Sequence, residues 1–138
     1  MKQIIYLTAV IVALVSLCFF LPAASNAQES ETIRVASASI CKDVVNRDTV
    51  DPGFSFKAEV AKLYCHTKIV GAQESTEVVH VWNYGDVERA RVTLAVNGSS
   101  WRTYSSKIIQ AHEIGAWHVD VIDASGHLLE TIWFSVTQ

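Results

Sequence analysis

The segment Lys62-Leu63-Tyr64-Cys65-His66-Thr67-Lys68-Ile69 decides the fold class of this chain. Every second side chain, from Leu63 to Ile69, can enter a core, whereas those between them are polar or amphipathic. A period of two is the pattern of a β-strand with one buried and one solvated face. The segment therefore predicts a strand of fixed register.

Similar short runs recur along the chain, separated by turn residues, and no segment after the first 27 residues keeps a helical period. We expect strands over 32–42, 62–69, 79–84, 92–96, 101–108, 117–122 and 128–136. About seven short antiparallel strands at this spacing predict an all-β domain, an immunoglobulin-like β-sandwich.

Turn chemistry supplies the connections between these strands. Asp43 to Lys57 is expected to be a loop, in which Pro52 fixes φ and Gly53 accepts a positive φ. Asn97-Gly98 predicts a tight hairpin that returns residues 101–108 beside the preceding strand. The segment from Asp123 to Gly126 predicts the last hairpin, with a left-handed glycine.

The first 27 residues have the features of a secretory signal peptide. Lys2 precedes an apolar run from Ile4 to Leu21, and Pro22 and small residues follow up to Ala27. This order predicts cleavage after Ala27 and a periplasmic or secreted protein. The alternative is an uncleaved inner-membrane anchor over residues 4–21, which are just long enough to span a bilayer.

Residues 28–138 are expected to form one β-sandwich domain. Removal of 27 from 138 residues leaves 111, a length that suits one compact domain. Without Lys2 the chain carries 10 Lys and Arg against 14 Asp and Glu, a formal net charge of −4. A mildly acidic domain is a poor candidate for nucleic-acid binding, and a membrane is expected to be a partner only through an uncleaved leader.

Two cysteines follow the leader, Cys41 and Cys65. Export would place them where disulfides persist, so the sequence favours a bond between them. A bond would stabilise so small a domain by about 3 kcal/mol. Two buried free thiols, which behave as small apolar groups, are the alternative.

Candidate ligand contacts concentrate in two segments. Alternation in 80–84 places three rings on one face, although sandwiches of this type often bury a tryptophan there, as Trp82 would be. In 101–107, both faces of the expected strand carry polar atoms, which favours either a polar network between the sheets or a ligand surface. The candidates are His80, Trp82, Trp101, Arg102, Tyr104, Ser106 and Lys107. Arg102 is singled out because a guanidinium binds carboxylates with two hydrogen bonds, and its alternative is an internal ion pair with Asp120 or Glu113.

Four blocks of the chain resemble a known bacterial family: His80-Val81-Trp82; Trp101 to Lys107; Gly115, Trp117, Val119, Val121, Asp123, Gly126 and Leu128; and Phe134 with Val136. The family is domain of unknown function 2914, and the likeness covers roughly Ile33 to Val136. It implies that Trp101, Arg102, Ser106 and Lys107 matter to the family, for folding or for binding. Where the family has an Arg-Glu-Pro-like segment, this chain has Arg47-Asp48-Thr49, which keeps the acid and lacks the proline.

Motifs of enzymes and cofactor sites are missing from the sequence. There is no G-x-S-x-G, P-loop or H-E-x-x-H, and the spacing of the five histidines fits no zinc site, so no metal or cofactor is expected. We expect a non-catalytic binding or accessory module of the envelope for a peptide, protein or glycan. The alternatives are an assembly domain that packs on another envelope protein through a sheet edge, and, with less support, a hydrolase.

Overall fold

The computed structural model describes residues 32–138, so the predicted signal peptide, its cleavage after Ala27 and the alternative anchor at 4–21 lie outside the described residues. The described elements are β1 (Arg34–Cys41), β2 (Asp43–Val45), β3 (Asp48–Val50), β4 (Ser55–Lys57), η1 (Ala58–Val60), β5 (Lys62–Val70), β6 (Thr76–Tyr84), β7 (Val87–Val96), β8 (Ser100–Ile108), β9 (Gly115–Asp123) and β10 (Leu128–Thr137). Over this range, no helix has the length and apolar character needed to cross a membrane.

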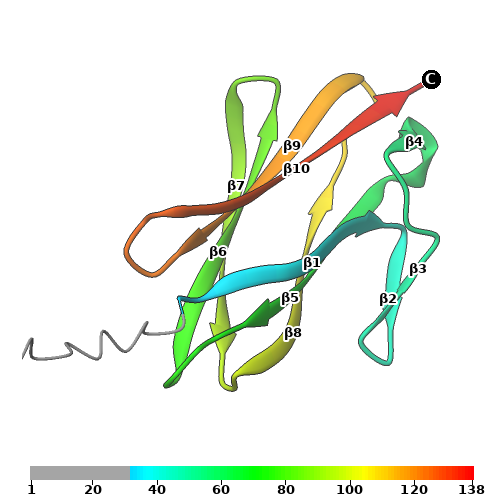
Figure 1. Ribbon diagram of the computed structural model, residues 1–138. Coiled ribbons are helices and arrows are strands. Elements are labelled where there is room, and N and C mark those ends of the chain that lie inside the picture. The colour runs from blue at the N-terminus through cyan, green and yellow to red at the C-terminus, as the bar shows by residue number, and fades with distance from the viewer. Residues whose placement is uncertain (1–31) are drawn as a thin grey trace, which may run out of the picture.

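Two packed sheets form a β-sandwich, which confirms the predicted fold class (Figure 1). One sheet has the order β1-β5-β8, and the other has the order β4-β10-β9-β6-β7. The pairs are antiparallel except β4, which runs parallel to β10. The seven long strands follow the order of strands A-B-E and G-F-C-C′ in an immunoglobulin-like sandwich.

The core lies between the sheets and is built from the alternating side chains. β5 contributes Leu63, Cys65 and Ile69, all fully buried, as the alternation predicts. From the other sheet, the Trp82 ring meets the Phe134 ring edge to face, with centroids 6.1 Å apart, and Trp117 stacks on Phe134 at 6.0 Å. Such large rings remove much apolar surface from water, which is the main stabilising contribution of the core.

The hairpin predicted at Asn97-Gly98 is wrong, because β7 and β8 lie in different sheets. Neither residue adopts a positive φ, as the tight two-residue turn would require. Instead β8 pairs along its whole length with β5, from Ser100 opposite Val70 to Ile108 opposite Lys62. Pairing between distant strands has outweighed a local turn signal. Gly126, by contrast, has a φ of 87° in the β9–β10 hairpin, as predicted.

The loop predicted for Asp43 to Lys57 is also wrong, because it contains the β2–β3 hairpin and β4. Asn46 and Arg47 link β2 to β3, and both have positive φ, of 52° and 65°. Two left-handed residues are the geometry of a two-residue hairpin turn. Asn46 is typical of the first position of such a turn, but Arg47 occupies the second position, where glycine is usual. Gly53 does not have the predicted positive φ, which Asp51 adopts instead.

No disulfide joins Cys41 and Cys65, which are both free and buried, so the predicted bond is corrected. The register of β1 against β5 gives the reason. Cys41 lies opposite Tyr64, and Cys65 lies opposite Ile40. Because paired residues share a face and successive residues alternate, the two thiols point to opposite sides of the sheet. Burial raises the pKa of both thiols.

Candidate functional site

The two faces of β8 carry the candidate residues in two separate environments. Ser105 points between the sheets and is buried, whereas Arg102 and Tyr104 point away from the core and are about half exposed, at 48% for the Arg102 side chain and 46% for Tyr104. Trp101 points toward the core and is half-buried. The structure therefore does not bring the seven predicted residues into one site.

The buried set is a hydrogen-bonded cluster that joins the sheets. We call Thr67, His80, Trp82 and Ser105 the inter-sheet cluster. Trp82 Nε1 donates to Ser105 Oγ at 3.0 Å, and His80 Nδ1 lies 2.7 Å from the same oxygen. On the other side of the ring, His80 Nε2 lies 3.1 Å from Thr67 Oγ1. His80 and Trp82 come from β6, while Thr67 and Ser105 come from β5 and β8.

One arrangement of protons satisfies the whole cluster. Since Ser105 Oγ accepts from Trp82, its own hydrogen is free to point at His80 Nδ1. His80 Nε2 then donates to Thr67 Oγ1, which donates to the Thr103 carbonyl at 3.5 Å. This order needs a neutral imidazole. Burial lowers the pKa of His80 to about 4, and the charge of nearby His66 adds to the shift.

The cluster explains His80 and Trp82 as residues of the interior. An open cleft that holds His80 near an acid would favour a hydrolase. His80 is fully buried, and its ring nitrogens contact two hydroxyl groups. The sequence had offered two explanations for polar atoms on both faces of this strand. A polar network between the sheets accounts for Ser105 on the inner face.

The outer face of β5 and β8 holds the remaining candidates. We give the name basic–aromatic face to seven of the outward side chains of these strands: Lys62, Tyr64, His66, Lys68, Arg102, Tyr104 and Ser106. The register places His66 opposite Tyr104, Lys68 opposite Arg102 and Tyr64 opposite Ser106. The Tyr64 and Tyr104 rings lie 6.1 Å apart, and Lys62 Nζ lies 5.3 Å from the Tyr64 centroid, within cation–π range.

Arg102 forms an ion pair, but with neither of the predicted partners. Its Nη1 donates to Asp48 Oδ1 at 3.1 Å, and the Asp48 side chain is 76% exposed. Glu113 instead pairs with Arg89 at 3.2 Å, and Asp120 accepts from Thr131 Oγ1 at 2.7 Å. A guanidinium has five N–H donors, so a single solvated partner leaves Arg102 able to bind a second anion.

The β2–β3 hairpin borders the basic–aromatic face. His66 Nε2 lies 2.8 Å from the Arg47 carbonyl oxygen, and the Arg47 guanidinium lies 6.0 Å from the Trp101 ring centroid. The left-handed conformation of Arg47 is uncommon for a residue with a side chain. These two contacts hold the hairpin tip against β5 and β8. The Arg47-Asp48-Thr49 segment contacts the Arg102 motif here, through the Arg102–Asp48 ion pair.

The sequence missed most of the basic–aromatic face. The sequence indicates Tyr64, His66 and Lys68 only as the solvated side of a strand, and Asp48 as a loop residue and the acid of the family-like Arg47-Asp48-Thr49 segment. Their convergence with Arg102 depends on β5 pairing with β8, whereas the sequence predicts only that residues 101–108 lie beside the preceding strand. Lys107 does not join the face: it lies opposite Leu63, and its Nζ donates to the Ile108 carbonyl at 2.7 Å.

Charge is distributed unequally between the sheets. The three-stranded sheet carries five basic residues (Arg34, Lys62, Lys68, Arg102 and Lys107) and no acidic one. The five-stranded sheet carries five acidic residues (Glu77, Glu88, Asp120, Asp123 and Glu130) against three basic ones (Lys57, Arg89 and Arg91). As for metals, the part of the chain from 32 to 138 brings no three His, Cys, Asp or Glu side chains together in a group that could hold an ion.

Comparison with protein families gives a match in the second half of the chain. The family model described as "Protein of unknown function (DUF2914)" matches residues 75–136. This stretch is similar to the DUF2914 family. The DUF2914 segment begins beside β6 and runs to the end of β10, so it includes His80, Trp82, Ser105, Arg102 and Tyr104. The resemblance drawn from the sequence is confirmed over this range, and for 33–74 it stays a prediction.

The first half of the sandwich lies outside the DUF2914 match. β1 to β5 precede residue 75, so Tyr64, His66 and Asp48 are not covered by it. A search of curated proteins found no match for the chain.

Proposed function

We propose that the protein is an exported, non-catalytic binding module of the bacterial envelope, and that the basic–aromatic face contacts its ligand. The leader predicted in residues 1–27 supports export. An intact mass that corresponds to a chain starting at Gln28 would support it further, and a mass that includes the leader would favour the membrane anchor.

The observation that carries this proposal is the combination of cations with an exposed tyrosine ring, Tyr104, and a half-buried one, Tyr64, on β5 and β8. Tyr64 and Tyr104 lie in the middle of the face, with Lys62 at one end and Lys68 and Arg102 at the other. No acidic residue belongs to either strand. A protein whose formal net charge is −3 thus presents a local surface of positive charge, which attracts anions.

An acidic glycan fits this surface best among the peptide, protein and glycan ligands that the sequence suggested. Flat rings stack on sugar faces, while lysine and arginine side chains bind carboxylates or sulfates. The middle strand β5 is hydrogen-bonded on both sides, so a ligand on the face meets side chains and not free backbone groups. Glycans need only such side-chain contacts.

Retention of the purified protein on immobilised polygalacturonate, with neutral dextran as the comparison, tests the proposal. We expect binding that weakens as salt is added and that weakens about fivefold or more in Arg102→Ala and Tyr104→Ala. Arg91→Ala is the matched control, since Arg91 is an exposed arginine of the other sheet that pairs with Glu88. Equal losses in Arg102→Ala and Arg91→Ala, with no loss in Tyr104→Ala, would mean that net charge alone drives retention. If the protein binds an acidic peptide and is not retained on polygalacturonate, the ligand class would change from glycan to protein.

Assembly through a sheet edge is the second candidate function. A specific observation favours it: β1 and β10 are neighbouring edges of the two sheets, and β10 is covered by β4 only at Ser135–Thr137. Unpaired strand edges are ready partners for another chain.

A further inference from the structure

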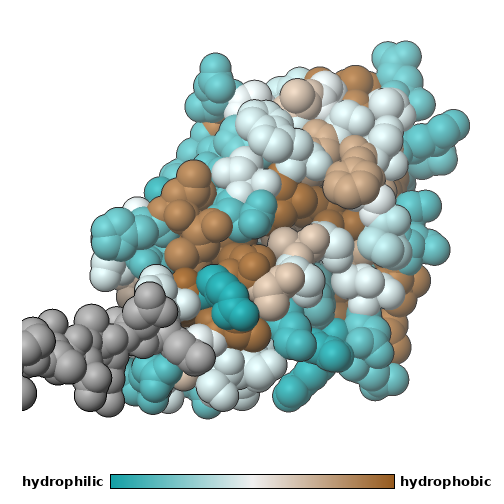
Figure 2. Space-filling view, in the orientation of Figure 1, coloured by the Kyte–Doolittle hydropathy of each residue, from teal (hydrophilic) through white to brown (hydrophobic). Residues whose placement is uncertain are grey.

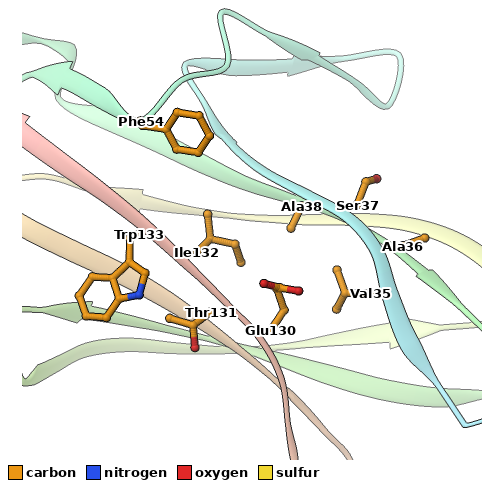
Figure 3. Close-up of a pocket in the computed structure, with 9 residues that line it drawn as sticks. All are labelled: Val35, Ala36, Ser37, Ala38, Phe54, Glu130, Thr131, Ile132 and Trp133. Carbon is orange, nitrogen blue, oxygen red and sulfur yellow. The ribbon is translucent and has the colours of Figure 1, made fainter.

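A groove opens where the two sheets separate, between β1 and β10. It encloses about 450 Å³, within the range of ligand-binding sites. Its lining includes Val35, Ala38, Phe54, Glu130, Ile132 and Trp133. Figure 2 shows hydrophobic residues gathered in the middle of this face and hydrophilic residues around them. In the close-up, Phe54 stands at one end, Val35 and Glu130 lie at the other, and Ile132 lies between them (Figure 3).

The β10 edge of the groove has backbone groups without a strand partner. Ser135 N–H donates to the Phe54 carbonyl at 2.8 Å, so Ser135 faces the edge that β4 occupies. Because alternate residues of a strand direct both N–H and C=O to the same side, Trp133 and Thr131 face that edge too. Within the described residues, no strand pairs with them there. β4 demonstrates that this edge accepts a strand.

On the opposite side of the groove, the edge of β1 also has backbone groups without a strand partner within the described residues. Gly53 N–H donates to the Ile40 carbonyl at 3.0 Å, so Ile40 faces away from β5. By the same alternation, Ala38 directs its N–H and C=O toward the groove. Irregular pairing occurs between Val35 and Ser37 and between Leu128 and Glu130. The two irregularities lie at the same end of the groove, where Val35 and Glu130 stand (Figure 3).

The other two sheet edges are protected by charge, and these are not. β7 carries Glu88, Arg89 and Arg91, and β8 carries Arg102 and Lys107. Such charged side chains on an edge discourage pairing with another strand. Between Val35 and Ile40 and between Leu128 and Phe134, Glu130 is the only charged residue. Phe54 and Trp133 are also 78% and 58% exposed, although they are large aromatic residues.

We propose that an extended segment of a partner protein binds in this groove as a strand added to the free edge of β10. The occupant is a peptide because only a polypeptide supplies alternating amide and carbonyl groups for Thr131 and Trp133. Its inward side chains are apolar, to cover Ile132 and Phe54, apart from one lysine or arginine that pairs with Glu130. This site gives the second candidate function a location and a partner chemistry, and it does not depend on the basic–aromatic face.

A designed peptide, acetyl-Ser-Val-Thr-Lys-Thr-Val-Ser-amide, is the probe, because its valines and lysine lie on one side of an extended strand. Amide chemical shifts of the isotope-labelled protein report where it binds. We expect shifts in residues 129–134 and in Trp133 Nε1–H. Replacement of lysine by glutamate should weaken binding on the order of fivefold, and N-methylation of alternate amides should abolish it.

Glu130→Lys should reverse the preference between the lysine and glutamate peptides. Glu77→Lys, which makes the same change of charge at an exposed position of β6, should not. Equal binding of the N-methylated peptide, shifts confined to other strands, or no binding at millimolar concentration would each overturn the proposal. Retention on polygalacturonate should survive in Glu130→Lys, so failure at the groove and failure at the basic–aromatic face are separate results.

Discussion

Ser105 and Arg102 lie three residues apart on β8, one in the inter-sheet cluster and one on the basic–aromatic face. In the cluster, each donor points at an internal acceptor, from Trp82 Nε1 through Ser105 and His80 to the Thr103 carbonyl. On the basic–aromatic face, Arg102 has one half-solvated contact, to Asp48. The comparison shows that polar residues on the two faces of one strand can have different roles. Saturated internal bonds stabilise the fold, and unsaturated external groups remain available for a ligand.

The largest effect on stability should come from removing the Trp82 ring of the inter-sheet cluster. Trp82→Ala leaves a cavity between Phe134 and the hydroxyl of Ser105 and should lower the free energy of unfolding by about 3–5 kcal/mol. Trp133→Ala, at an exposed tryptophan of β10, should cost about 1 kcal/mol or less. Urea denaturation compares the two. Similar losses would contradict the separation of interior from surface.

The inter-sheet cluster should also make the fold sensitive to acid. His80 titrates near 6.5 in the unfolded chain and near 4 in the fold. Above pH 6.5 neither state holds the proton, and between pH 6.5 and 4 only the unfolded state gains it. The free energy of unfolding should therefore fall by about 3 kcal/mol over this window and change no further through His80 below it.

Two variants isolate that contribution. His80→Gln should be less stable at pH 7 because the ring bonds are lost, but its stability should fall less between pH 6.5 and 4. His112→Gln, at an exposed position, should keep the full decrease of the parent protein. Parallel curves for all three proteins would rule out His80 as the source.

Adjacent serines on β8 provide the next test. Ser105→Ala removes the acceptor of Trp82 Nε1 and the partner of His80 Nδ1, so it should cost about 1–3 kcal/mol. Ser106→Ala lies on the other face and should change stability by about 0.5 kcal/mol or less. Thermal unfolding of the two variants tests whether the inner face of β8 contributes more to stability than the outer face.

A small effect is expected from Arg102→Ala. An exposed ion pair contributes little, so the free energy of unfolding should change by about 0.5 kcal/mol or less. A loss of about 3 kcal/mol or more would mean a buried pair, and would assign Arg102 to the fold. Asp48→Ala should match it in stability, and it should strengthen retention of an acidic ligand by removing the competing carboxylate.

Addition of a reductant should not change the free energy of unfolding, because Cys41 and Cys65 are free thiols. In a chain that starts at Gln28, two thiols should react under denaturing, non-reducing conditions, because Cys41 and Cys65 point to opposite sides of their sheet. In the native state both should react slowly, since they are buried and their pKa values are raised. A single bonded pair in the protein would contradict the register of β1.

Alternation within strands was sufficient to predict the fold class. The alternate residues Leu63, Cys65 and Ile69, and Val119 and Val121, face the core because a strand has a period of two, and this needs no knowledge of its neighbours. Trp82 is a candidate ligand contact in the sequence, with burial in the core as the alternative, and the structure buries it fully. The left-handed Gly126 followed from its hairpin.

Contacts between distant segments could not be predicted in the same way. Asn97-Gly98 has a strong local preference, yet the pairing of β8 with β5 decides where the chain goes. Asp48 reaches Arg102 only because Asn46-Arg47 forms a turn that lacks the usual glycine. The groove depends on two edges from different sheets, and no single stretch of sequence contains both.

The unequal charge of the two sheets has a consequence for how the molecule meets its surroundings. Lysines and arginines on β5 and β8 and acids on β6, β9 and β10 make the sandwich an electric dipole directed through its thickness. Near a polyanionic layer, such a dipole experiences a torque that turns the three-stranded sheet toward the layer before any contact forms. At physiological ionic strength this orientation acts over about 8 Å, so productive collisions should become rarer as salt rises even where the bound state is unchanged.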